Sequence, residues 1–122
     1  MKNKDVYHVD KPWGWEKIWA KTPFYVGKMI YIRKGCRLSF QYHERKTETI
    51  YIVEGQMTLV IGDEKEQIEM SFCDSYHIPS GLKHRFWAPD MDCLVMEVST
   101  SQLDDVQRLE DDFDRINSDK NP

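Results

Sequence analysis

The chain has 122 residues, the usual size of one domain and enough to bury a hydrophobic core. Hydrophobic residues make up 40% and aromatic residues 12% of it, a composition typical of a folded globular protein rather than a disordered one. The 17 basic and 21 acidic residues give a net charge of −4 without a basic stripe, so we expect no nucleic-acid partner.

The first segment, residues 1–23, is predicted to be an N-terminal arm. Its start, MKNKDVYHVDKPW, lacks the apolar run of a signal peptide, and no segment of the chain reaches membrane-spanning length. The cysteines, Cys36, Cys73 and Cys93, are odd in number and share no CxxC spacing, which argues against a disulfide framework. We therefore expect a cytoplasmic protein from a reducing compartment, with no membrane partner.

Residues 24–100, the predicted core, alternate short apolar runs with turn signals. The runs are rich in Ile, Val, Tyr and Phe, and Gly, Pro or Asp interrupts them every eight to twelve residues. This rhythm is typical of a small antiparallel sandwich or barrel. The sequence IGDE at 61–64 places a Gly-Asp pair between two runs, which predicts a hairpin. We expect an all-β fold over this region.

The end of the chain has a different pattern. Its apolar residues recur at helical spacing with acidic residues between them: Leu103, Val106, Leu109, Phe113 and Ile116. The pattern predicts a C-terminal α-helix over about residues 102–117 that covers one face of the barrel.

Polar residues with metal-binding side chains interrupt two of the apolar runs. Successive side chains of a strand alternate between its faces, so four residues are expected on one face: Arg37, Ser39, Gln41 and His43. Glu48 follows across a short polar turn, and His84 opens a later strand after a turn with Pro79 and Gly81. Two imidazoles, a carboxylate and an amide oxygen can bind a divalent metal and leave a position open.

The spacing of these residues resembles the two motifs of the cupin superfamily. The first motif, G-x5-(H)-x-H-x4-E-x6-G, matches residues 35–55, with Gln41 in the first ligand place. The second, G-x5-P-x-G-x2-H-x3-N, matches residues 73–88 except at its leading Gly and trailing Asn. The resemblance implies a single-domain cupin over residues 1–122, a double-stranded β-helix or jelly-roll barrel. It also implies one divalent metal ion bound by Gln41, His43, Glu48 and His84.

Within the cupins, the chain resembles the C-terminal cupin domain of type II mannose-6-phosphate isomerases, which are often fused to a mannose-1-phosphate guanylyltransferase. The matching stretches are KPWG at 11–14, GCRLSFQYHERKTETIYIVEG at 35–55, HIPSGLKHRFWAP at 77–89, MEVS at 96–99 and RLEDDFDR at 108–115. The resemblance implies a metal-dependent aldose–ketose isomerase that acts on a sugar phosphate. No nucleotidyltransferase half accompanies these residues, so we expect no guanylyltransferase activity.

The chain departs from that domain family near the substrate. HHHRAEHW of the family is HERKTETI here, so Lys46 replaces an Arg and Ile50 replaces a Trp. Lys46 keeps the positive charge but not the planar fork that suits a phosphate. If residue 50 faces inward, as alternation from Glu48 indicates, losing the Trp widens the pocket.

The ligand set indicates the chemistry. A neutral Gln with two His and one Glu leaves a positive centre, which suits a Lewis acid, with Zn²⁺ as first choice and Mn²⁺, Ni²⁺, Co²⁺ or Fe²⁺ as alternatives. Isomerisation also needs a base, for which Glu97 and His77 are candidates by their positions in strands. Candidate substrate-binding residues are Arg37, Ser39, Lys46, Arg85 and Lys11.

Two other functions remain open. One is another small metal-cupin enzyme, such as a lyase or an iron dioxygenase, although the Gln ligand disfavours the dioxygenase. The other is a non-catalytic sugar-binding or accessory cupin, favoured by Lys46 and Ile50. We also expect a homodimer formed through an edge strand or an exchanged N-terminal segment, because exposed sheet edges need cover.

Overall fold

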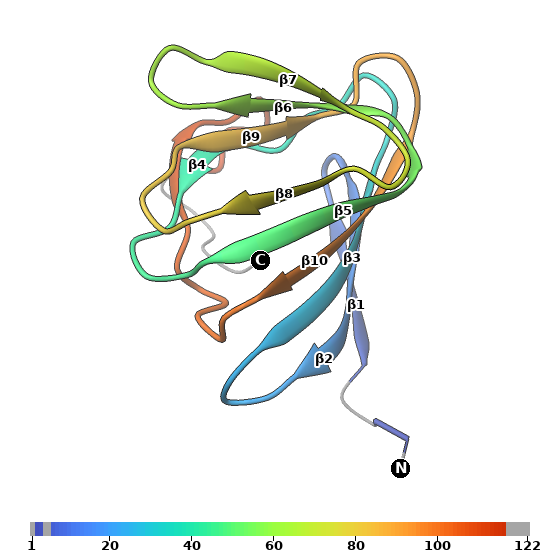
Figure 1. The fold of residues 1–122 in the computed structure, drawn as a ribbon, viewed down its shortest axis with the longest axis vertical. Helices are drawn as coiled ribbons and strands as arrows, with labels where there is room; N and C mark the ends of the chain where they lie inside the picture. The colour runs from blue at the N-terminus through green and yellow to red at the C-terminus, as the bar shows by residue number, and fades with distance from the viewer. Residues whose placement is uncertain (1, 4–5, 117–122) are drawn as a thin grey trace.

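The computed structural model describes residues 2–3 and 6–116, which fold into two antiparallel sheets that face each other (Figure 1). The larger sheet has the strand order β1 (Tyr7–Lys11), β2 (Gly14–Lys21), β3 (Val26–Ile32), β10 (Cys93–Ser99), β5 (Glu48–Gly55) and β8 (Ser75–Ile78). The smaller sheet has the order β11 (Gln107–Glu110), β4 (Phe40–Tyr42), β9 (His84–Trp87), β6 (Met57–Ile61) and β7 (Glu66–Met70). The predicted all-β jelly-roll architecture is confirmed.

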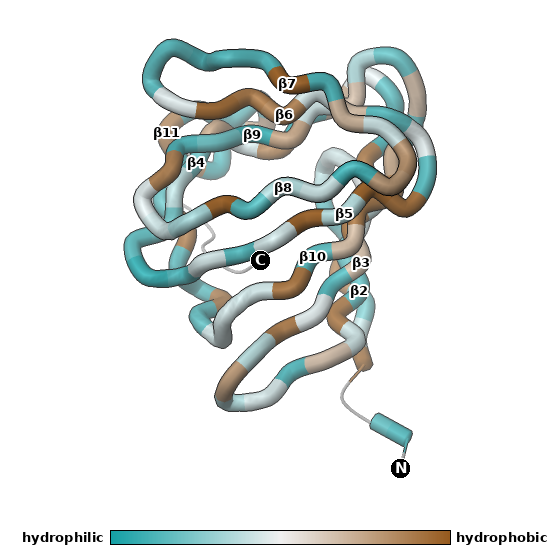
Figure 2. The backbone as a smooth tube through the Cα atoms, viewed as in Figure 1, coloured by the Kyte–Doolittle hydropathy of each residue, from teal (hydrophilic) through white to brown (hydrophobic). Residues whose placement is uncertain are grey.

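Alternation along the strands builds the core between the sheets. On β5, Ile50 and Ile52 are completely buried, and on β10 the buried Val95 pairs with Ile52. Leu59 of β6 faces them from the smaller sheet and is also completely buried. Figure 2 shows hydrophobic and hydrophilic segments succeeding one another along β5 and β10, as this pattern requires. The predicted hairpin at 61–64 is confirmed as the turn between β6 and β7.

At one end of the larger sheet, charged residues take the inward positions in place of apolar ones. On β3 the inward series is Val26, Lys28, Ile30 and Ile32, and all four side chains are buried. Lys28 lies directly opposite Glu97 of β10 in the register of the two strands. The sheet therefore presents an apolar half, which forms the core, and a charged half, which forms a cavity.

The predicted N-terminal arm, residues 1–23, contains β1 and β2, which extend the larger sheet beside β3. Within the described residues no helix is long and apolar enough to cross a membrane. All three cysteines are free thiols, as expected from their spacing.

The predicted C-terminal helix is wrong over the described residues. Residues 101–116, here called the C-terminal strap, contain turns and β11, which pairs with β4. Two of its acidic residues, expected on the solvent face of a helix, instead bind specific partners. The Asp105 carboxylate accepts bonds from the main-chain N–H groups of residues 44–46, and Asp112 pairs with Arg37. These long-range contacts outweigh the local helical preference. Residue 117, the last of the predicted helix, lies outside the described residues.

Candidate metal centre and cavity

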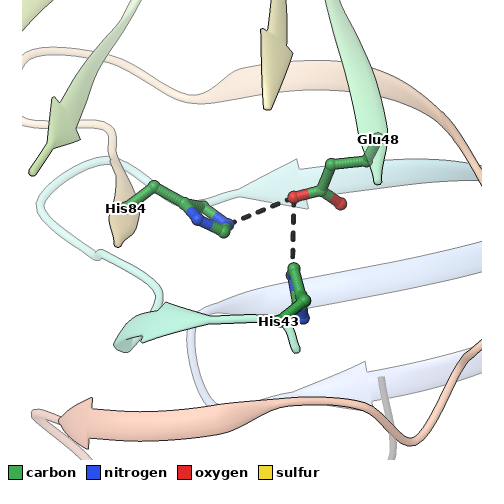
Figure 3. A group of neighbouring side chains, drawn as sticks. All are labelled: His43, Glu48 and His84. Carbon is green, nitrogen blue, oxygen red and sulfur yellow. Dashed lines mark ion pairs between the residues drawn. The ribbon is translucent and has the colours of Figure 1, made fainter. Parts of the chain in front are cut away.

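Three of the four predicted metal ligands come together between the sheets. His43 follows β4, Glu48 begins β5 and His84 begins β9. The Glu48 Oε1 atom lies 3.5 Å from Nε2 of His43 and 3.1 Å from Nε2 of His84. Figure 3 shows this carboxylate oxygen between the two imidazoles. All three side chains are buried, and their ligand atoms lie within 4.8 Å of one another.

The turn before β9 brings the second motif to the first. Gly81 has a φ of 84°, a left-handed conformation that favours glycine. Its N–H donates to the backbone carbonyl of His43 at 2.7 Å. The predicted turn therefore ties His43 to the segment that carries His84.

The backbone fixes the tautomer of both imidazoles. His43 Nδ1 lies 2.5 Å from the Asp105 carbonyl oxygen, and His84 Nδ1 lies 2.9 Å from the Leu82 carbonyl oxygen. A carbonyl oxygen only accepts, so each Nδ1 carries the proton and donates it. Each Nε2 then offers a lone pair toward Glu48, the arrangement found in metal-ligating histidines.

The polar atoms that meet at this point fit a bound cation. Nε2 of His43, Nε2 of His84 and both Glu48 carboxylate oxygens are buried without a hydrogen-bond partner in the described part of the chain. Buried polar atoms in that state are costly unless another group satisfies them. Two imidazole nitrogens and a carboxylate are a donor set that Zn²⁺ and other divalent transition metals accept.

Gln41, the fourth predicted ligand, lies beside the cluster. It pairs with His84 in the register of β4 and β9, so both side chains point to the same face. Gln41 lines the cavity, where its Oε1 accepts a hydrogen bond from the Ser39 hydroxyl at 2.6 Å. Its role as a ligand stays a prediction.

A buried row of alternating charges extends from the cluster across the larger sheet. Lys46 Nζ lies 3.3 Å from Glu48 Oε2 and 3.2 Å from Glu97 Oε2. Lys28 Nζ continues the row, 4.0 Å from Glu97 Oε2 and 3.7 Å from Glu16 Oε2. All five side chains are nearly inaccessible to solvent. Together with His43 they define the charged wall of the cavity.

The environment shifts the pKa values of this row in opposite directions. Burial raises the pKa of Glu97 to about 7, and the charge of Glu48 adds to the effect. Burial also disfavours the charged forms of Glu48 and Lys46. For Glu48, the Lys46 ammonium, joined by the two imidazoles when they are protonated, outweighs burial and holds the pKa well below its ordinary value. For Lys46, the carboxylates of Glu97 and Glu48 outweigh burial and raise the pKa.

The cavity has a volume of about 50 Å³ and is closed on one side by the C-terminal strap. The strap contributes two apolar and two basic residues to the lining: Leu103, Val106, Arg108 and Arg115. Asp111 holds Arg115 through a bidentate pair, with N–O distances of 2.8 and 3.1 Å. The two arginines are the two ends of the RLEDDFDR stretch and both line the cavity. Three acidic residues between them pair with basic side chains: Glu110 with Lys65, Asp111 with Arg115 and Asp112 with Arg37.

The predicted substrate-binding residues divide into two groups. Lys11, Ser39 and Lys46 line the cavity, whereas Arg37 and Arg85 do not. Arg37 precedes β4, and alternation is broken there because the adjacent residues Leu38 and Ser39 both line the cavity. Its guanidinium pairs with Asp112 at 2.7 Å.

Arg85 is buried and binds backbone carbonyls, those of Leu38 at 2.8 Å and Glu110 at 3.3 Å. The two candidate bases also separate. Glu97 lines the cavity, whereas His77 is exposed and contacts Thr49. Ile50 faces inward as expected, but it packs in the core.

Sequence reasoning missed four charged residues of the cavity: Glu16, Lys28, Arg108 and Arg115. A signal existed for Lys28, which occupies an inward position in an otherwise apolar series on β3. The same holds for Glu16, which lies two residues before the buried Ile18 on β2. The two arginines carried no such signal, because the apolar spacing over residues 102–117 predicts a helix and not a segment folded over the cavity.

Two facing antiparallel sheets with a His/Glu/His cluster between them define a β-sandwich protein with a site suited to a metal ion. Residues 28–99, more than half of the chain, match the family model of the cupin domain, and the chain belongs to that family. Among characterised proteins it is similar to quercetin 2,3-dioxygenase from Bacillus subtilis (strain 168), with 38% identity over 53 residues. This match covers 43% of the chain but only 15% of the dioxygenase.

Solved structures share the fold. KdgF from Halomonas sp. aligns with a TM-score of 0.70 and 24% identity over 80% of this chain and 86% of its own. The polyketide cyclase RemF from Streptomyces resistomycificus aligns with a TM-score of 0.74 and 21% identity over 86% and 80% of the two chains. Oxalate decarboxylase from Bacillus subtilis aligns with a TM-score of 0.76 and 16% identity over 89% of this chain and 31% of its own.

Proposed function

We propose that the protein is a metal-dependent enzyme that moves a proton next to a carbonyl group of a small anionic sugar, with aldose–ketose isomerisation of mannose 6-phosphate as the first reaction to test. The observation that carries this proposal is the position of Glu97, a buried carboxyl group in the cavity wall that shares Lys46 with the predicted ligand Glu48, at 3.2 and 3.3 Å. Burial also raises the pKa of Glu97 to about 7. A carboxyl group with that pKa can both accept and donate a proton near neutral pH.

The bound metal would supply a Lewis acid that polarises the substrate carbonyl or hydroxyl oxygen. His43, Glu48 and His84 would hold it, with Gln41 as the proposed fourth ligand. Glu97 would take the proton from one carbon and return it to the next, through Oε2 of its carboxylate, which lines the cavity. Lys46, 3.2 Å from that atom, orients the carboxylate.

The charge of the lining supports an anionic substrate. Five basic side chains contact the cavity against three carboxylates: Lys11, Lys28, Lys46, Arg108 and Arg115 against Glu16, Glu48 and Glu97. Arginine forks are well suited to phosphate oxygens. This composition, with the sequence resemblance to type II mannose-6-phosphate isomerases, favours a sugar phosphate over an uncharged sugar.

The direct test is conversion of mannose 6-phosphate to fructose 6-phosphate by zinc-loaded protein in deuterated water. We expect turnover with deuterium entering C1 of the fructose 6-phosphate and, through the reverse step, C2 of the remaining mannose 6-phosphate, and a loss of at least 100-fold in Glu97→Gln with its metal retained. Glu54→Gln, an exposed carboxylate on β5, is the matched control and should keep full activity. Metal-loaded protein that binds the sugar phosphate without turnover or exchange would favour a non-catalytic binding module instead.

A second candidate is an oxygen-dependent cupin reaction, favoured by the 38% identity to part of a quercetin dioxygenase. Loading the protein with Fe²⁺, Mn²⁺, Co²⁺ or Ni²⁺ and measuring oxygen consumption with quercetin tests it. We expect none, because the eight charged side chains that line the cavity suit a small anionic ligand better than a flat aromatic one.

We also propose a homodimer. β1 and β8 form the edges of the larger sheet, and Phe24, Tyr25 and Val98 are exposed apolar residues at 82%, 55% and 49%. Sedimentation equilibrium should give twice the chain mass.

A further inference from the structure

Glu16 and Lys28 form a buried ion pair away from the predicted metal ligands. Glu16 on β2 and Lys28 on β3 are 4% and 2% exposed, and both line the cavity. The Nζ–Oε2 distance of 3.7 Å is longer than a normal hydrogen bond. The pair therefore leaves hydrogen-bonding capacity unused inside the cavity.

The unused capacity lies on Glu16 in particular. Its Oε2 atom is buried and has no hydrogen-bond partner among the described residues. Oε2 of Glu97 also makes no hydrogen bond of good geometry there, although Lys46 Nζ lies 3.2 Å from it. A buried carboxylate oxygen without a donor is costly, so such an atom indicates a donor that the chain itself does not supply. Lys28 lies between these two acceptors and carries N–H donors.

A hydroxyl group suits this series of a carboxylate acceptor, an ammonium donor and a second carboxylate acceptor, because it donates one hydrogen bond and accepts others. One hydroxyl can donate to Glu16 and accept from Lys28, and the next can donate to Glu97. An anionic group would be repelled by Glu16, and an apolar group would leave all these atoms unsatisfied. We infer that Glu16 and Lys28 form a hydroxyl-binding subsite for a polyhydroxylated substrate. The inference deepens the proposed function and rests on it for the choice of a sugar phosphate.

The strand order places this subsite well away from the predicted metal ligands His43, Glu48 and His84. β2 is separated from β5 by β3 and β10. Neighbouring strands lie about 4.8 Å apart, so the backbones that carry Glu16 and Glu48 are about 14 Å apart across the sheet. A ligand that contacts both ends is therefore an extended chain with several hydroxyl groups.

Equilibrium binding of a polyol that cannot react separates this subsite from catalysis. The probe is D-mannitol 6-phosphate, which has no carbonyl group, together with its 3-deoxy and 4-deoxy analogues, titrated calorimetrically into zinc-loaded protein. We expect at least one deoxy analogue to bind the natural protein about tenfold more weakly than the parent polyol, as for a lost hydrogen bond to a charged group. In Glu16→Gln that difference should fall to less than threefold.

Matched variants complete the experiment. Lys17→Met, on the same strand but exposed, should bind all three polyols like the natural protein. If Glu16→Gln or Lys28→Met does not fold, the uncharged pair Glu16→Gln/Lys28→Met replaces it, since removing both charges leaves neither ion of the pair without its partner. Equal discrimination by the natural protein and the Glu16 variant would overturn the inference, as would absence of polyol phosphate binding by the natural protein. Failure to isomerise mannose 6-phosphate, with discrimination intact, would overturn only the proposed function.

Discussion

The backbone carbonyl of Asp105 accepts a hydrogen bond from Nδ1 of His43 at 2.5 Å, so the C-terminal strap positions a predicted metal ligand. The carboxylate of the same residue accepts bonds from the N–H groups of residues 44–46, at 2.7 to 3.1 Å. These bonds hold the pKa of Asp105 below its ordinary value, although burial alone would raise it. One residue thus joins the strap to the segment between His43 and Glu48.

Replacing Asp105 should loosen both the strap and the metal site. Asp105→Ala leaves three main-chain N–H groups without their acceptor, and we expect the free energy of unfolding to fall by about 2–3 kcal/mol. Metal affinity should fall about tenfold, because the orientation of His43 depends on the strap. Urea denaturation and a competitive zinc titration measure the two effects. Asp104→Ala, at the exposed neighbouring position, should change neither. An unchanged metal affinity in Asp105→Ala would contradict the positioning role.

Glu97 should make the metal-free protein less stable as the pH rises. Its pKa is raised from 4.5 to about 7 in the folded chain, so the unfolded chain loses this proton at lower pH than the folded one. The cost is absent below pH 4.5, increases between 4.5 and 7 and is complete above 7. We expect the stability of Glu97→Gln, relative to the natural protein, to increase across that window in chelator-treated samples. Denaturation midpoints at several pH values measure it, and a constant difference would contradict the pKa of Glu97.

Removing the metal should lower thermal stability without unfolding the sheets. The ligands come from three separate segments, so the ion binds only the folded chain and stabilises it by mass action. At a free zinc concentration 100 times the dissociation constant this effect is about 2.7 kcal/mol. Differential scanning calorimetry with and without chelator should show a lower melting temperature. Circular dichroism at 25 °C should stay β-rich, since the apolar half of the sandwich does not depend on the site.

The arginines of the strap, rather than Arg37, should bind the anionic group of the substrate. Arg115→Ala and Arg108→Ala each remove a guanidinium from the cavity lining, and we expect each to weaken binding of inorganic phosphate about tenfold. Arg37→Ala serves as the control, because its guanidinium pairs with Asp112 and is not part of the lining. It should cost less than about 1 kcal/mol of stability, as for a partly exposed ion pair, and leave phosphate binding unchanged. Calorimetric titration of inorganic phosphate into each zinc-loaded variant measures these affinities.

The fold and the grouping of His43, Glu48 and His84 could be predicted because their signals are local. The apolar runs between 24 and 100 alternate with period 2, and His43, Glu48 and His84 occur at motif spacing. The charged row could not be assembled in the same way. Lys28, Glu97 and Glu16 meet only because β3 pairs with both β10 and β2 in a particular register, which a single strand does not encode.

In the C-terminal strap the local sequence pattern predicts the wrong structure. Leu103, Val106 and Phe113 have the spacing of one helical face, yet the segment pairs with β4 and folds over the cavity. The spacing of residues within the strap cannot reveal that the Asp105 carboxylate binds three backbone N–H groups, which belong to residues 44–46. Contacts between distant parts of the chain decided the structure here, and with it the placement of Arg108 and Arg115.

His43, Glu48 and His84 should together bind one divalent metal ion, and elemental analysis of protein purified without added metal measures this. The natural protein and His77→Ala, which removes an exposed histidine outside the cavity, should each contain about one divalent ion per chain, with zinc expected. His43→Ala and His84→Ala should contain less than a tenth of that amount while remaining folded. Equal metal content in all four proteins would contradict the assignment of the site.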